Sequence, residues 1–233
     1  PHLSVTLGNQ ATIHLEFGDV EEARIAAERA VAIAEARFAA NDHRLGMTLE
    51  TLASVYFEAG EYQRAADLAE RALHIRDAAQ GPDHEELISS LTLLAKSLER
   101  LGQTDRAQER YQRVLDLAER RLKPTDVRLA IAFSDCGAFQ RRHRVPQAAS
   151  DLLDRAVAAF EASGNVSHPR LAEALAERAA LRLQVGNPDG ALAVALRAER
   201  LSRDHFRRTI AGLPENGALK FGASRPRGVG TGI

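Results

Sequence analysis

Apolar residues in this chain recur at steps of three and four positions, which is the spacing of one face of an α-helix. Leu49, Leu52 and Tyr56 follow this spacing ahead of Gly60, and the apolar residues of 62–75 follow it again after that glycine. Glycine lets the chain leave a helix in a left-handed conformation that costs other residues more. The pattern therefore predicts two helices joined at Gly60.

The same pattern recurs with a period of 42 residues, so the chain is built from internal repeats. The glycine at the junction, called here the turn residue, recurs as Gly18, Gly60, Gly102 and Gly186, with Arg144 at the fourth place. Positions are counted from this turn residue. Position +5 holds Ala23, Ala65, Ala107, Ala149 and Ala191; position +12 holds Ala30, Ala72, Val114, Ala156 and Ala198; position −7 holds Ala11, Ala53, Ala95, Gly137 and Ala179. These columns predict places where two helix backbones approach too closely for larger side chains.

The predicted fold is all-α: an α-α superhelix (solenoid) of five tandem helix-turn-helix repeats with an extended last helix. Each helix pair exposes an apolar face that only a neighbouring pair can cover, so we expect the pairs to stack. The repeats are assigned to residues 3–42, 43–84, 85–126, 127–168 and 169–211, and residues 212–233 to a C-terminal junction or tail. Between the second and third repeats, Pro82 cannot continue a helix and Asp83 is the expected cap of the next one.

The segment LASVYFEAGEYQRAADLAERAL (52–73), followed by GPDH (81–84), resembles the 42-residue form of the tetratricopeptide repeat found in kinesin light chains and many bacterial scaffolds. The resemblance covers about residues 3–205. Arg144 departs from it at the turn position, and Pro146 and Pro188 open second helices, where proline is tolerated. The resemblance implies a concave groove, lined by the first helix of each repeat, that binds a peptide or a partner domain.

A second, shorter stretch, RLSRDHFRRTIAGLPENGALKFGASRPRG (200–228), resembles the junction that follows such repeats in bacterial proteins with a CHAT domain, a caspase-like peptidase region. This resemblance implies that the chain is the recognition arm of a longer bacterial protein. An alternative function is therefore the regulatory arm of a caspase-like peptidase whose catalytic CHAT domain lies beyond residue 233.

The composition favours a globular helical protein in a reducing compartment. Hydrophobic residues make up 45% of the chain and charged residues 27%, and the formal net charge is −1, which gives no overall attraction to nucleic acid or anionic membranes. A single cysteine excludes a disulfide framework. The apolar runs are too short for a membrane span, and residues 1–15 lack the features of a signal peptide. A cytoplasmic location is expected.

No residues form a recognisable catalytic, metal or cofactor motif, and we predict a protein that is not an enzyme and has no cofactor. Cys136 lies at position −8, in the column of Leu52 and Leu94, which indicates a buried core residue. His84 and His168 both lie at position +24, two repeats apart, so they are assigned to the joint between repeats and not to a shared metal.

Charged residues give the predicted groove a polarity. The groove face of each first helix comprises positions −13, −10, −6, −3 and −2, and position −2 reads Glu16, Glu58, Arg100, Arg142 and Gln184. Lys96 and Arg141 lie beside these arginines. We therefore expect an acidic or bipolar peptide segment whose negative part lies over Lys96, Arg100, Arg141 and Arg142. The simpler alternative is ordinary surface charge.

Two further expectations concern the rest of the surface. The basic segments 140–146 and 203–209 allow a weaker third hypothesis, nucleic-acid binding, although they lack interleaved aromatic residues for stacking on bases. Gln10 and His14 in the first repeat, and Arg178 and Arg182 in the last, occupy columns that are apolar in the second and third repeats. We expect these faces to meet something other than another identical repeat.

Overall fold

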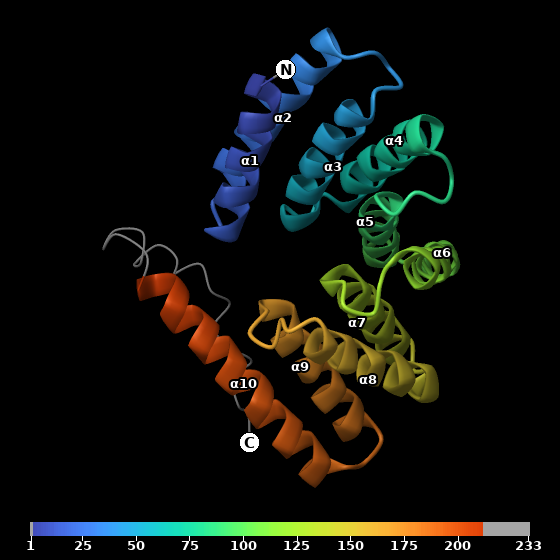
Figure 1. Cartoon of the computed structure of the whole chain (residues 1–233), viewed down its shortest axis with the longest axis vertical. Helices are drawn as coiled ribbons and strands as arrows, with labels where there is room; N and C mark the ends of the chain where they lie inside the picture. The colour runs from blue at the N-terminus through green and yellow to red at the C-terminus, as the bar shows by residue number, and fades with distance from the viewer. Residues whose placement is uncertain (1, 212–233) are drawn as a thin grey trace. The chain divides into compact units, whose positions relative to one another are not determined.

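The computed structural model describes residues 2–211, and every regular element in that part of the chain is an α-helix (Figure 1). The helices are α1 (His2–Glu16), α2 (Val20–Arg37), α3 (His43–Glu58), α4 (Tyr62–Gln80), α5 (Leu87–Arg100), α6 (Thr104–Arg121), α7 (Val127–Arg142), α8 (Pro146–Ala162), α9 (Pro169–Gln184) and α10 (Pro188–Ala211). The all-α class is thus confirmed. The junction assigned to 212–233, and with it most of the CHAT-like stretch, lies outside the described residues.

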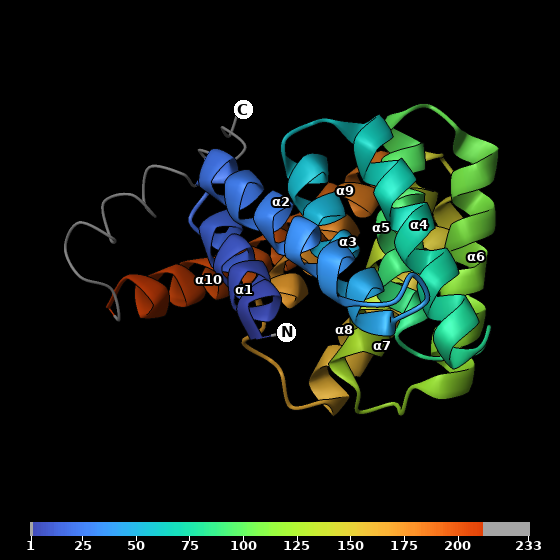
Figure 2. The same cartoon turned by 90° about the horizontal axis from the view of Figure 1, so that it is seen from above.

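The helices form two compact units, which meet within α6: unit 1 includes residues up to Arg110, and unit 2 is Tyr111–Ala211. In unit 1, successive helices from α1 to α5 pack against each other (Figures 1 and 2). Among the first helices of the repeats, α1 also contacts α3, and α3 contacts α5. In unit 2, α7 to α10 pack in the same way, and α7 contacts α9. Each unit is therefore a stack of helical hairpins.

The turn residues adopt the left-handed conformation that the glycine pattern predicts. The φ angles of Gly18, Gly60, Gly102 and Gly186 are 76°, 79°, 74° and 80°. Arg144 has the same conformation, with φ of 60°, and is the one non-glycine residue with positive φ in the described part of the chain. The repeat geometry therefore holds the fourth turn in a backbone conformation that its own side chain disfavours.

The alanine columns mark the closest helix contacts. Nine of the ten residues at positions +5 and +12 are at most 2% exposed, and the tenth, Ala198, is 7% exposed: Ala23, Ala30, Ala65, Ala72, Ala107, Val114, Ala149, Ala156, Ala191 and Ala198. In the fourth repeat, position −7 has become glycine, and a Cβ added to Gly137 would lie 2.9 Å from Cγ of Leu153. Leucine at position +9 thus leaves no room for the alanine found in the other repeats.

Position +24 supplies most of the caps on the next first helix. The side chains of Asp42, Asp126 and His168 accept hydrogen bonds from the backbone amides at the starts of α3, α7 and α9. The prediction that Asp83 caps α5 is wrong, because α5 begins at Leu87 after a longer turn. In that turn, Nδ1 of His84 accepts from the amide of Glu86, at 3.3 Å, in the same column as the other caps. Both histidines at position +24 thus serve the joint, as their spacing predicts.

Candidate functional site

In unit 1, the predicted groove residues lie on the first helices and reach solvent near the helix ends. Glu16 and Glu58 are the last residues of α1 and α3 and are exposed, while Lys96 is half-buried on α5. Arg100, the last residue of α5, is also exposed. Three neighbouring first helices therefore present two carboxylates and then a guanidinium to solvent at equivalent positions.

The guanidinium of Arg100 is held in place by an aromatic ring. Its Nη2 donates a hydrogen bond to the hydroxyl of Tyr62, at the start of α4, and its Cζ lies 4.6 Å from the centroid of that ring. The rings of Tyr62 and Phe57 in turn pack in a T-shaped arrangement, with centroids 5.4 Å apart. These contacts order the cation and leave it exposed, so it can still pair with an external anion.

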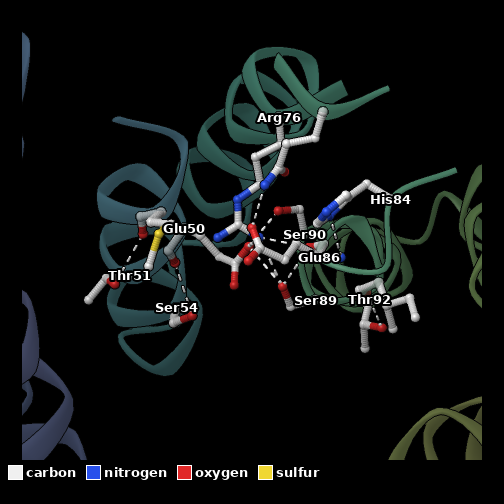
Figure 3. A network of polar contacts seen from close by, with 12 residues as sticks. Glu50, Thr51, Ser54, Arg76, His84, Glu86, Ser89, Ser90 and Thr92 are labelled. Carbon is white, nitrogen blue, oxygen red and sulfur yellow. Dashed lines mark hydrogen bonds and ion pairs between the residues drawn. The ribbon is translucent and has the colours of Figure 1, made fainter. Parts of the chain in front are cut away.

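A mostly buried polar network lies where α3, α4 and α5 meet (Figure 3). Arg76 of α4 is only 5% exposed, and its Nη1 lies 3.0 Å from Oε2 of Glu50 on α3. The same nitrogen donates to the carbonyl oxygen of Glu86 at 2.7 Å and to Oγ of Ser89 at 3.2 Å. Oε2 of Glu50 also accepts hydrogen bonds from the hydroxyls of Ser89 and Ser90. The network joins three helices of two successive repeats.

Glu86 completes the network at the start of α5. Nε2 of Gln80 donates to Oε2 of Glu86 at 2.8 Å. This hydrogen bond, with the nearby positive charge of Arg76, lowers the pKa of the Glu86 carboxyl below its ordinary value. The carboxylate therefore stays charged to a lower pH than an ordinary glutamate.

Sequence reasoning missed Arg76, although a signal was present. Arg76 lies at position +16, where the other repeats have Ala34, Ala118, Phe160 and Ser202. Gly46, at position −14 of the same repeat, is the matching change, because a Cβ there would lie 3.0 Å from Cγ of Arg76. A larger residue at +16 and a smaller one at −14 in the same repeat are therefore the sequence signal of the buried arginine.

In unit 2, the two predicted groove arginines share one acidic partner. Nε of Arg141 donates to Oε2 of Glu177 on α9 at 2.6 Å, and Nη1 of Arg142 lies 4.0 Å from the other oxygen of that carboxylate. Arg142 keeps an exposed side chain, whereas Arg141 is about three-quarters buried. Of the two, Arg142 therefore has the more available positive charge.

A second ion pair lies deeper between α7 and α9. Asp135 is 7% exposed, and one of its oxygens accepts from Nη2 of Arg170. Arg170 also pairs with Glu173 on its own helix. Burial alone would lower the pKa of Arg170, but these two carboxylates outweigh it and raise that pKa. The contact between successive first helices in unit 2 is thus charged as well as apolar.

The four polar residues in apolar columns of the terminal repeats are not buried among apolar side chains. Gln10 is exposed and His14 is half-buried. In the last repeat the arginines do contact a repeat: Nε of Arg178 lies 2.7 Å from Oδ1 of Asp154 on α8, and Nη1 of Arg182 donates to the carbonyl of Gly190 on α10. The expectation that this face meets something other than a repeat is therefore wrong for Arg178, because the preceding repeat supplies its partner.

The remaining candidate residues form no metal-binding group in the described part of the chain. Cys136 is 1% exposed, and its Sγ contacts the carbonyl oxygen of Tyr111 at 3.6 Å. Among residues 2–211, no group of three or more His, Cys, Asp or Glu side chains is arranged to hold a metal ion. No helix in this part of the chain is long and apolar enough to cross a membrane. In the basic segment 203–209, Arg203 is already paired with Glu199.

Comparison with known proteins identifies the repeat. A family model described as tetratricopeptide repeat matches residues 2–78 and 44–120, which together cover just over half of the chain. No curated protein sequence matches the chain.

Several solved structures have a similar fold. A kinesin light chain protein of nearly identical TPR-like repeats from Podosopora anserina superposes with a TM-score of 0.66 at 20% identity, over 85% of this chain and 94% of that one. BtubC (BKLC) from P. vanneervenii gives a TM-score of 0.67 at 21% identity, over 92% and 86%. A Rap protein complexed with Competence and Sporulation Factor gives 0.73 at 14% identity, over 91% of this chain and 60% of that one. At these identities the likeness shows the fold alone, an all-α solenoid of tandem repeats.

Proposed function

Because the chain belongs to the tetratricopeptide repeat family, we propose that it is a non-catalytic protein-interaction scaffold that binds a peptide or a partner domain on the groove face of its first helices. Proteins of this fold support the proposal. The Rap conjugation gene regulator of the plasmid pLS20, whose TM-score is 0.70 at 11% identity, was solved in complex with a Phr* peptide. The buried, single cysteine is compatible with a cytoplasmic location, which is part of the proposal.

The charge at position −2 is the observation that carries the choice of partner. In unit 1, this position is Glu16 and Glu58 in the first two repeats and Arg100 in the third, and all three side chains are exposed. In unit 2, Arg142 is exposed at the same position. We propose a partner segment with an acidic part that pairs with Arg100 and Lys96 in unit 1, or with Arg142 and Arg141 in unit 2. Because Arg141 is held by Glu177, it contributes less of this attraction than Arg142.

Selection from a random peptide library on the immobilised full chain tests the proposal. The selected peptides should be enriched in Asp and Glu, and their affinity should fall as salt is raised, because exposed charges are screened. The variant Arg100→Glu with Arg142→Glu should lose binding of these peptides while keeping its helicity and its melting temperature.

A matched control carries the same change of charge on second helices. Arg37 on α2 and Arg120 on α6 are exposed and lie outside the groove face. Replacing both by glutamate should leave peptide binding unchanged. Selected peptides without acidic enrichment would remove the proposed charge preference. Undiminished binding by the Arg100 and Arg142 variant would move the binding site away from the groove face.

A further inference from the structure

A stripe of side chains on α1 lacks the cover that its counterparts have in every later repeat. The stripe consists of positions −15, −12, −8 and −5, whose steps of three and four residues place them on one helix face. In α1 these residues are Leu3, Thr6, Gln10 and Ile13, and all four are exposed. Leu3 and Ile13 are 55% and 53% exposed.

The equivalent residues of the later first helices are buried, except Arg178 at position −8 of the last repeat, whose side chain is 25% exposed. At position −15 every repeat has leucine, and Leu45, Leu87, Leu129 and Leu171 are 2%, 0%, 7% and 0% exposed. At position −5, Val55, Ser97, Phe139 and Leu181 are at most 3% exposed. Within each unit, α3 packs on α2, α5 on α4, and α9 on α8. In these repeats the stripe therefore lies against the second helix of the preceding hairpin, and α1 carries the same stripe without that neighbour.

Ion pairs between the second helices of successive hairpins also recur at fixed positions of the repeat. Position +11 is arginine in all five repeats: Arg29, Arg71, Arg113, Arg155 and Arg197. Arg71 pairs with Glu35 at 2.7 Å, Arg197 with Glu161 at 2.6 Å, and Arg155 with Glu119. In each case the carboxylate lies at position +17 of the preceding hairpin. Arg29 is exposed and has no ion-pair partner among residues 2–211.

In the first and fourth repeats, a second carboxylate, at position +10, bonds to the stripe side of the next first helix, whereas Glu70 in the second repeat lies 3.9 Å from Arg106 and Arg110 on α6. Oε1 of Glu28 accepts from the hydroxyl of Tyr56 at 3.0 Å, at position −4 of the next repeat. Asp154 accepts from Arg178, at position −8, at 2.7 Å. Gln10 occupies position −8 in α1. A carboxylate at +10 of a hairpin packed on α1 would therefore face the amide of Gln10.

We propose that the α1 stripe is a docking surface for another helical hairpin of the same repeat type, with carboxylates at positions +10 and +17. Burial of Leu3 and Ile13 supplies the driving force, and Arg29 and Gln10 set the register. The hydroxyl of Thr6 already donates to the carbonyl of His2, so it can be buried as Thr48 is, with its hydroxyl on the carbonyl of Arg44.

The charges argue against a second copy of this chain as the occupant. Its last hairpin, α9 and α10, has Leu196 at position +10 and Arg203 at position +17. Head-to-tail stacking would therefore bring Arg203 against Arg29, and it would offer no carboxylate to the amide of Gln10, whose Nε2 lies 3.4 Å from Nε2 of His14. The preferred occupant is a hairpin with carboxylates at positions +10 and +17, where the hairpin of α9 and α10 has Leu196 and Arg203.

The chain supplies a suitable hairpin for the test. Residues 127–168 contain Asp154 at +10 and Glu161 at +17, and this hairpin packs on α9 within unit 2. Fused in front of the full chain, it places α1 in the register of α9. With Ile13→Cys as the probe, maleimide labelling should be at least about tenfold slower in the fusion than in the unfused chain, because the thiol becomes buried.

A matched probe is available on α2. Ile25 is 43% exposed at position +7, and the equivalent residues of the later repeats, Asp67, Glu109, Asp151 and Ala193, are also exposed. Labelling of Ile25→Cys should therefore be the same with and without the added hairpin. Glu161→Arg in the added copy should speed labelling of Ile13→Cys about twofold to fivefold, and Arg29→Glu should reverse this effect.

Two results would overturn the proposal. One is an equal labelling rate of Ile13→Cys in the fusion and in the unfused chain. This result counts against the proposal even if circular dichroism shows that the added hairpin forms no helix. The other is protection of Ile13→Cys in the unfused chain that increases with protein concentration, because a second copy would then be the occupant.

Discussion

Replacement of the buried Arg76 by methionine should destabilise unit 1 by about 3 kcal/mol. The change keeps the aliphatic part of the side chain and removes the guanidinium that lies 3.0 Å from Glu50. The gross attraction of the pair is roughly 5 kcal/mol at an effective dielectric constant of about 20. Loss of one partner of a buried pair costs about 3–5 kcal/mol, because the remaining charge is left buried and unpaired.

The lower end of that range applies here for two structural reasons. The Glu50 side chain is 20% exposed, so water can solvate part of the remaining charge. Its Oε2 also keeps the hydroxyls of Ser89 and Ser90 as donors. The carbonyl of Glu86, in contrast, loses its 2.7 Å donor.

Removal of both charges should recover most of this loss. The third repeat provides the model for the double variant, since it has Ala118 and Thr92 at the positions of Arg76 and Glu50. Because apolar replacement of a whole buried ion pair is often close to neutral, Arg76→Met with Glu50→Thr should lose only about 1 kcal/mol. In the double-mutant cycle the coupling energy is therefore about 2 kcal/mol plus the loss caused by Glu50→Thr alone.

The assay is urea unfolding followed by circular dichroism, together with hydrogen exchange of the α4 and α5 amides. The exchange measurement is needed because the chain has two units, whose unfolding need not be one two-state transition. A coupling energy below about 0.5 kcal/mol, or a single variant that is as stable as the parent protein, would refute the account of a tightly coupled buried pair.

Three further changes test the geometry of the repeat. Arg144→Gly should raise the stability by about 0.5–1 kcal/mol, measured as a higher melting temperature, because glycine removes the strain of a φ angle of 60°. Gly137→Ala should lower it by about 1–3 kcal/mol in the same measurement, because the new Cβ would lie 2.9 Å from Cγ of Leu153; an unchanged melting temperature would mean that α8 shifts easily. Hydrogen bonds from the Arg44 side chain and backbone lower the pKa of Asp42 from 3.8 to about 2, so the stability from this cap is complete above pH 3.8 and is lost as the pH falls toward 2. An NMR titration should show this pKa, and Arg44→Ala should raise it; an ordinary value in the parent protein would disprove the pairing.

Much of the fold could be predicted from the sequence because its determinants are local and repeated. Apolar spacing determines the helices, and a left-handed glycine such as Gly60 determines where a helix ends. Alanine at +5 in five repeats and at +12 in four of five predicts the close helix contacts, since a small residue kept at one position has a steric explanation. Asp83 was assigned wrongly because capping depends on the length of the turn, which no column records.

The candidate site could be predicted only in part. The exposed charges Glu58 and Arg100 follow from helix periodicity alone. The partner of Arg141 could not be read from the sequence, because Glu177 lies 36 residues away on another helix. The pairs Arg71–Glu35 and Arg197–Glu161 have the same separation of 36 residues.

A separation of 36 residues is six residues shorter than the 42-residue repeat. The difference of six residues arises because one hairpin is displaced lengthwise relative to the next. The displacement comes from the packing of two hairpins and not from the residues of either one. For the same reason, only the tertiary structure shows that Leu3 and Leu45, identical in residue type and register, differ in cover: 55% and 2% exposed. The sequence by itself determined the repeating unit, and the stacking of the units decided which of its charges are paired and which of its apolar faces remain open.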